Sequence, residues 1–130
     1  MILQFMKLPT KFKPNRFKNK KIFNERDNTP YLTPEWRKYR FRFLHHNPKC
    51  YACGMPSSQV EHLYSVRNYP EKFKELTNHI PLCHGCHSTI TIHFDQDRKC
   101  NVDGKLKWFA DERLKRNLTF KIKVLPKYES

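Results

Sequence analysis

Four of the five cysteines stand in two pairs with the same inner spacing, Cys50-x2-Cys53 and Cys83-x2-Cys86. A C-x2-C pair places two thiolates on one tight turn, and two such turns facing each other supply four soft ligands in a tetrahedron, which suits zinc. A site closed by four thiolates has no open position, so this zinc would be structural. Cys100 stands alone and is expected to be a free thiol.

A second set of residues that could bind a metal or transfer a proton lies between and beside these pairs: Glu61, His62, Asn78 and His87. A carboxylate and an imidazole can hold one divalent ion and leave positions for water and a phosphate oxygen. A separate histidine beside that ion can remove a proton from an attacking water, which is the equipment for phosphodiester hydrolysis. Each residue alone also has a plainer explanation: Asn78 as a turn residue, His87 as an alternative zinc ligand and Glu61-His62 as a chance dipeptide.

In order and between two cysteine pairs, these residues form a pattern that resembles the HNH endonucleases, in particular the subgroup with a four-cysteine zinc knuckle. The resemblance covers roughly residues 36–94. It implies a small α+β fold of the ββα-metal type, in which a two-stranded ribbon packs against a helix around one catalytic divalent ion. Small proteins of this kind are often phage-encoded or homing-type nucleases, which is an analogy at family level.

The resemblance also implies roles for individual residues. His62 corresponds to the general base, and Glu61 and His87 correspond to ligands of the catalytic ion, Mg²⁺ or Mn²⁺ with Ni²⁺ or Zn²⁺ as alternatives. Asn78 corresponds to the asparagine that fixes the loop orienting the base. The family more often has aspartate where this chain has Glu61, and Thr91 stands where some relatives have a further histidine, so a two-ligand site is expected.

Several elements must position these residues. Thr33-Pro34-Glu35 is a helix start, and Asn47-Pro48 should end that helix, because a residue before proline resists the helical conformation. Its apolar face is expected to carry Trp36, Tyr39, Phe43 and Leu44. Beyond it the patterns predict strands over 59–66, 79–82 and 120–124, helices over 87–95 and 106–118, a helical turn within 70–76, and a turn at Asp103-Gly104.

The charge of the chain indicates a polyanionic partner. Lysine and arginine number 26 against 12 acidic residues, which gives +14 and a pI of about 9.8. The charge divides the chain into a basic, aromatic-containing arm (1–32, net +6), a core (33–97, net +2) and a basic extension (98–130, net +6), which sum to +14. Double-stranded DNA is the expected partner, and Lys38, Arg42 and Arg67 are candidate phosphate contacts, with a solvated basic surface as the alternative.

The sequence thus predicts a metal-dependent DNA endonuclease that nicks or cuts DNA. The alternative is a non-catalytic, zinc-stapled nucleic-acid-binding protein or a phage assembly or packaging factor. No apolar run approaches the ~20 residues of a membrane span, and Met1–Met6 is shorter than a signal-peptide core, so a soluble cytoplasmic protein is expected, in the host cytoplasm if the chain is phage-encoded. Sequence specificity and the choice between monomer and homodimer stay open.

Overall fold

The computed structural model describes residues 29–96 and 99–128, and the chain divides into two compact units, Met1–Leu32 and Thr33–Ser130. In the first unit the described residues form a single 3-10 helix, η1 (Thr29–Leu32). The rest of the basic arm predicted over 1–32 lies outside the described residues. The second unit contains every predicted site residue.

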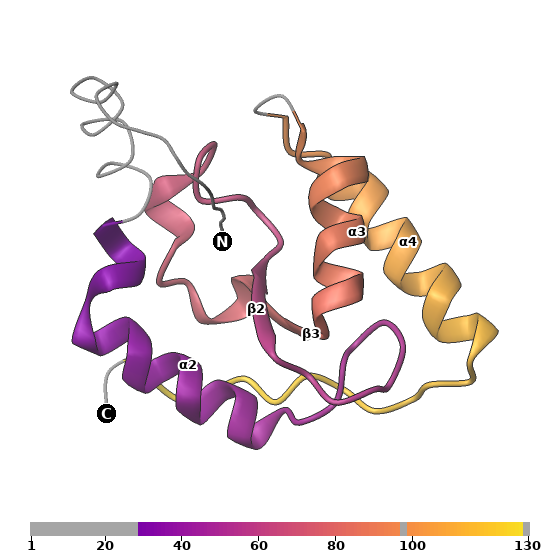
Figure 1. Cartoon of the computed structure of the whole chain (residues 1–130), viewed down its shortest axis with the longest axis horizontal. Helices are drawn as coiled ribbons and strands as arrows, with labels where there is room; N and C mark the ends of the chain where they lie inside the picture. Colours follow the sequence, from indigo (N-terminus) through magenta and orange to yellow (C-terminus); the bar gives the residue numbers. More distant parts are fainter. Residues whose placement is uncertain (1–28, 97–98, 129–130) are drawn as a thin grey trace, which may run out of the picture. The chain divides into compact units, whose positions relative to one another are not determined.

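The centre of the second unit is a two-stranded antiparallel sheet. Strand β2 (Gln59–His62) pairs with β3 (His79–Leu82), and Glu61 lies opposite Ile80 in the register. Helix α2 (Pro34–His46) lies on one side of this ribbon, and α3 (His84–Phe94) and α4 (Val102–Lys115) lie on the other (Figure 1). The predicted α+β class is therefore correct for this unit.

Helix α2 forms where the sequence predicts it. The hydroxyl of Thr33 accepts a hydrogen bond from the backbone N–H of Trp36 at 3.1 Å, and Pro34 occupies the first turn, where its missing N–H costs nothing. The helix ends before Asn47, as expected. Its buried face carries Trp36, Tyr39 and Phe43, while Leu44 is half-buried.

Two sets of side chains cover the two sides of the ribbon. An aromatic cluster fills the α2 side and contains Trp36, Tyr39, Phe43, Phe73 and Tyr128. A second hydrophobic core fills the α3/α4 side and contains Cys50, Ala52, Ile80, Leu82, Ile90 and Phe109. The ribbon is buried on both sides, so its side chains are divided between two separate environments.

Strand β2 is shorter than the predicted strand over 59–66, which is wrong in its second half. The backbone N–H of Leu63 donates to the carbonyl of Asn78. The Asn78 side chain then accepts a hydrogen bond from the N–H of Tyr64 and donates one to its carbonyl, so the chain turns away from the ladder. The helical turn predicted within 70–76 is the 3-10 turn η2 (Pro70–Lys72), and a second 3-10 turn, η3 (Leu76–Asn78), follows it. Strand β3 has the predicted bounds.

The predicted bounds of the last two helices are wrong because their caps lie earlier. Helix α3 starts at His84 instead of residue 87, since the Cys83 sulfur accepts the backbone N–H of Cys86 at 3.4 Å. Helix α4 starts at Val102 instead of residue 106, since the Asn101 side chain accepts the N–H of Gly104 at 2.9 Å. The predicted turn at Asp103-Gly104 is thus the first turn of α4.

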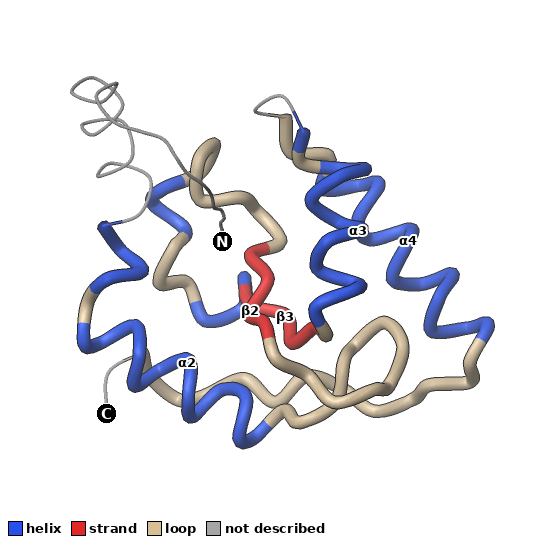
Figure 2. Tube along the Cα trace, in the orientation of Figure 1, coloured by secondary structure: helices blue, strands red, loops and turns tan. Residues whose placement is uncertain are grey.

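The predicted strand over 120–124 does not form. The segment after α4 passes along α2 as an extended chain with no strand partner in the described residues (Figure 2). Its backbone pairs with a side chain instead: the Asn47 amide accepts from the N–H of Lys123 at 2.7 Å and donates to its carbonyl at 3.0 Å. An asparagine amide can satisfy only one residue of a strand, so no ladder is propagated.

Candidate metal centre and the residues around it

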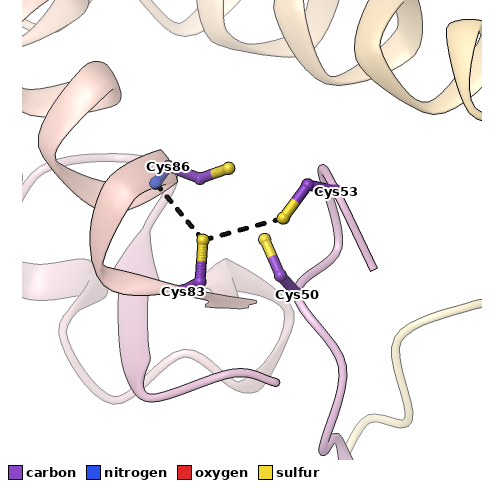
Figure 3. Close-up of side chains that lie close together, drawn as sticks. All are labelled: Cys50, Cys53, Cys83 and Cys86. Carbon is purple, nitrogen blue, oxygen red and sulfur yellow. Dashed lines mark hydrogen bonds between the residues drawn. The ribbon is translucent and has the colours of Figure 1, made fainter. Parts of the chain in front are cut away.

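The four paired cysteines form one cluster. Their sulfur atoms all lie within 4.8 Å of one another, and those of Cys53 and Cys83 are 3.7 Å apart (Figure 3). Four thiolates bound at about 2.3 Å around one tetrahedral ion lie about 3.8 Å from each other, so the cluster fits a metal ion. This group can therefore hold a structural metal, as the spacing predicts.

Local backbone structure brings the two pairs together. Cys50 and Cys53 lie on a tight turn closed by two backbone hydrogen bonds, Gly54 N–H to Cys50 carbonyl at 2.8 Å and Cys50 N–H to Met55 carbonyl at 2.6 Å. Gly54 has φ of +81°, a conformation that a side chain disfavours, so glycine is needed there. Cys83 is the N-cap of α3, and Cys86 lies in its first turn.

The surroundings of two of the four sulfurs oppose their ionisation when no cation is bound. Burial raises the pKa of the Cys53 and Cys86 thiols, and the neighbouring Cys50 adds repulsion at Cys86. Burial opposes ionisation of Cys83 too, but hydrogen bonds from the Cys86 backbone and from the neighbouring thiols lower its pKa. Four thiolates are stable together only when a positive ion offsets their repulsion.

A second pair of candidate ligands, Glu61 and His87, meets on the α3 side of the ribbon. The Nδ1 atom of His87 lies 2.8 Å from Oε1 of Glu61. In the structure this contact is a direct hydrogen bond, and two ligands of one ion at about 2.1 Å would also lie about 3 Å apart. Within the described residues the four cysteines are the only group of three or more metal-ligating side chains, and Thr91, one turn after His87, is exposed. The pair therefore offers two protein ligands.

Asn78 holds the loop that follows β2. Its Oδ1 accepts the N–H of Tyr64 at 2.7 Å, and its Nδ2 donates to the carbonyls of Tyr64 and Lys72, both at 3.1 Å. The side chain is 2% exposed. Asn78 thereby ties together two points of the loop between the strands.

His62 is not brought to the Glu61–His87 pair. Successive side chains of a strand point to opposite faces, and His62 accordingly enters the aromatic cluster, with ring centroids 4.9 Å from Phe73 and 5.5 Å from Trp36. It is 5% exposed. Burial and the nearby His79 lower the pKa of His62 to about 3, although a hydrogen bond to the Phe73 carbonyl opposes this shift.

The second histidine next to the aromatic cluster, His79, is buried, and both of its ring nitrogens form hydrogen bonds. Its Nδ1 accepts from the hydroxyl of Tyr39 at 2.5 Å, and its Nε2 donates to the Phe73 carbonyl at 2.8 Å. His79 therefore has a structural place between α2 and the loop. His84 and His93 are exposed.

Two residues beside Glu61, Lys105 and Asp95, were not predicted from the sequence. Lys105 is fully buried, and its ammonium contacts Oε2 of Glu61 at 3.3 Å and Oδ1 of Asp95 at 3.0 Å. Burial alone would lower the pKa of Lys105, but these two carboxylates outweigh it and raise that pKa. A lysine in a helix normally indicates a solvated face, and the apolar residue that shares the buried side of α4 with Lys105 is Phe109, one turn later. Cys100 is half-buried, and its sulfur accepts the N–H of Ser65 at 3.3 Å.

The candidate phosphate contacts lie in different places. Lys38 is exposed on α2, and Arg42, one turn later, donates to the carbonyl of Lys127 at 3.3 Å. Arg67 is exposed in the loop after β2. Two further exposed lysines, Lys121 and Lys123, lie on the extended segment that Asn47 holds beside α2. The structure thus places basic side chains on α2 and on the segment packed against it.

Among the described residues, no helix is long and apolar enough to cross a membrane. Comparisons of the chain with protein-family models, with curated proteins and with solved structures found no match.

Proposed function

We propose that this chain is a metal-dependent DNA endonuclease of the HNH type, with zinc in the four-cysteine cluster. The observation that carries the proposal is the meeting of Glu61 from β2 and His87 from α3 at 2.8 Å, beside a ribbon whose loop is tied by Asn78. Residues far apart in the sequence converge there at hydrogen-bond distance, which supports the proposal because two ligands of one divalent ion lie similarly close together. The four cysteines hold α3 to the turn at Cys50 and so stabilise the helix that carries His87.

In this proposal Glu61 and His87 hold Mg²⁺ or Mn²⁺, with Ni²⁺ or Zn²⁺ as alternatives. The ion supplies stabilisation of the charge that develops on the phosphate and on the leaving oxygen. With only two protein ligands, the site leaves room for water and for a phosphate oxygen of the substrate. A phosphate can approach the pair from the side of His87, because the His87 side chain is partly exposed whereas the Glu61 carboxylate is buried.

His62 is the proposed general base. Because one ring nitrogen bonds to the Phe73 carbonyl, the other carries the lone pair that accepts a proton. The low pKa keeps the imidazole neutral at physiological pH, but a pKa of about 3 also makes it a weak base, so the proposal requires that pKa to rise when DNA binding exposes the ring. Since His62 is 5% exposed, we expect the aromatic side chains over it to shift when DNA binds, so that water reaches the ring.

The proposed substrate is double-stranded DNA. The net charge of +14 favours a polyanion, and the lysines of the segment beside α2 offer contacts to phosphate. Such contacts carry no sequence information, so the proposal extends to nicking or cutting of DNA and not to a recognition sequence. One site per chain would nick, and a symmetric dimer could cut both strands.

The test is a supercoiled-plasmid assay with zinc-loaded protein in Mg²⁺, Mn²⁺, Ni²⁺ and Zn²⁺. We expect nicking by the wild type, and its loss in Glu61→Gln and His87→Ala with DNA binding retained. Thr91→Ala, an exposed change one turn beyond His87 on α3, is the matched control and should cut normally. Full cleavage by Glu61→Gln would refute the metal site.

The role of His62 needs a separate experiment, because the His62→Ala variant removes a ring from the aromatic cluster as well as the proposed base. Added imidazole can enter the cavity that this variant leaves and replace the missing base. We expect loss of cleavage in His62→Ala and partial recovery with imidazole. Undiminished cleavage by a folded His62→Ala variant would exclude His62 as the base.

The second candidate is a non-catalytic, zinc-stapled nucleic-acid-binding protein, including a phage assembly or packaging factor. The burial of His62 and the contact of Lys105 with Glu61 favour it, since both reduce access to the catalytic groups. A divalent-ion titration after zinc is saturated distinguishes the two. A second, weaker site that Glu61→Gln removes supports the enzyme, whereas DNA binding without such a site supports the second candidate.

A further inference from the structure

The Lys105 side chain of α4 is an internal cation at the Glu61–His87 pair. It has no exposed surface, and its ammonium lies among oxygen atoms from two carboxylates and two backbone carbonyls. These are Glu61 Oε2 at 3.3 Å, Asp95 Oδ1 at 3.0 Å, the His62 carbonyl at 3.3 Å and the Leu63 carbonyl at 2.8 Å. A buried ammonium persists only with such compensation, so this is a built site.

The contacts divide the two oxygens of the Glu61 carboxylate. Oε2 faces Lys105 from α4, and Oε1 faces His87 from α3. Glu61 is itself 3% exposed, so it has little freedom to turn. Glu61 and His87 would therefore hold a divalent ion through the Oε1 side of the carboxylate, because Lys105 occupies Oε2.

We propose that Lys105 is a positioning residue that acts as a built-in counter-cation: it presents a single Glu61 oxygen to the divalent ion beside His87, and its charge limits the affinity for that ion. The inference rests on the proposed metal site. Glu61, Asp95 and Lys105 together have a formal charge of −1, and only the Glu61 carboxylate would separate the ammonium from an ion held beside His87. Even with the screening of bulk water, a unit charge about 5 Å from a divalent ion changes its affinity about tenfold.

The experiment is a double-mutant cycle that changes the charge around Glu61. For each zinc-loaded variant, the affinity for Mn²⁺ is measured by electron paramagnetic resonance. Mn²⁺ prefers oxygen and imidazole ligands to thiolates, so the cysteine cluster does not interfere. Lys105→Met takes the net charge of this group to −2, Asp95→Asn takes it to 0, and the double variant restores −1. Lys107→Met is the matched control: the same change on the same helix, at a lysine that is exposed and paired with Asp111.

We expect Lys105→Met to bind Mn²⁺ at least tenfold more tightly and Asp95→Asn to bind it more weakly. The double variant should return close to the wild type, and Lys107→Met should not differ from it. A purely structural role for Lys105 predicts the opposite sign, because loss of a structural residue would loosen the site. Unchanged or weaker binding in Lys105→Met would overturn the proposal.

Two provisions keep the test decisive. If Lys105→Met alone does not fold, the double variant is compared with Asp95→Asn: removal of the lysine charge should again tighten Mn²⁺ binding, and failure to do so overturns the inference. Cleavage is measured in parallel. If the Mn²⁺ affinities change as expected but the protein does not cut DNA, the nuclease proposal alone is refuted. If cleavage depends on Glu61 but the Mn²⁺ affinity is the same in all variants, the role of Lys105 alone is refuted.

Discussion

Replacing Asn78 with alanine should destabilise the second unit strongly. The change removes three hydrogen bonds to backbone groups of Tyr64 and Lys72 and leaves those groups without their partner in a buried place. At about 1 kcal/mol for each bond, the free energy of unfolding should fall by about 3 kcal/mol. For a domain of this size that loss lowers Tm by roughly 10–20 °C.

The measurement is urea unfolding of the zinc-loaded protein, with Asn68→Ala as the control. Asn68 lies in the same loop but is exposed, and its side chain accepts a hydrogen bond from Ser65 at 3.1 Å. We expect the control to lose less than about 1 kcal/mol, since exposed hydrogen bonds compete with water. A loss in Asn78→Ala no larger than in the control would refute the view that this amide ties the loop.

Three further predictions concern the metal, the pH dependence and the partner. Cys53→Ser, or a strong chelator, should remove one tightly bound metal per chain and lower Tm markedly, as measured by elemental analysis and thermal unfolding. The pKa of an unfolded histidine is about 6.5, and burial lowers the pKa of His62 to about 3, so the unfolded state binds more protons between these values. The free energy of unfolding therefore decreases as the pH is lowered, by about 1.4 kcal/mol from His62 between about pH 7.5 and 5.5. The His62→Phe variant should lack this decrease when urea unfolding is measured at the two pH values. Changing Lys121 and Lys123 to glutamine should reduce the slope of log affinity for DNA against log salt by about 1.8, whereas the same change at Lys107 and Lys115, which pair with acidic neighbours, should reduce it less.

Local signals in the sequence were enough for the elements whose ends carry strong caps or breakers. Thr33, Pro34 and Pro48 set the limits of α2, and the repeated C-x2-C spacing predicted the cysteine cluster. The strand at 59–66 was predicted too long because the apolar residues Leu63 and Val66 continue past His62. What ends the strand is Asn78, a residue distant in sequence, and local pattern cannot report such a contact.

The errors in the C-terminal region have a similar cause. The alternation of Phe120, Ile122 and Val124 is real, but a strand also needs a partner strand, and the segment meets α2 and the Asn47 amide instead. Lys105 was missed because its charge normally marks a solvated surface. Its burial depends on Glu61 and Asp95 being close to each other, which only the packing of α4 against α3 produces.

The Glu61-His62 dipeptide shows what a motif leaves undetermined. A sequence pattern gives the types and order of residues, but adjacent residues in a strand point to opposite faces, so Glu61 joins His87 and Lys105 while His62 joins the aromatic cluster. A base and a metal ligand on opposite faces can act on one phosphate only where the strand ends and its two faces are no longer separated by a neighbouring residue. Strand β2 ends at His62, and Lys105 binds the His62 and Leu63 carbonyls at that point. The end of β2 is therefore the place where a substrate phosphate has to bind if the two residues share one reaction, and where the packing of Lys105 and of the aromatic rings has most influence on it.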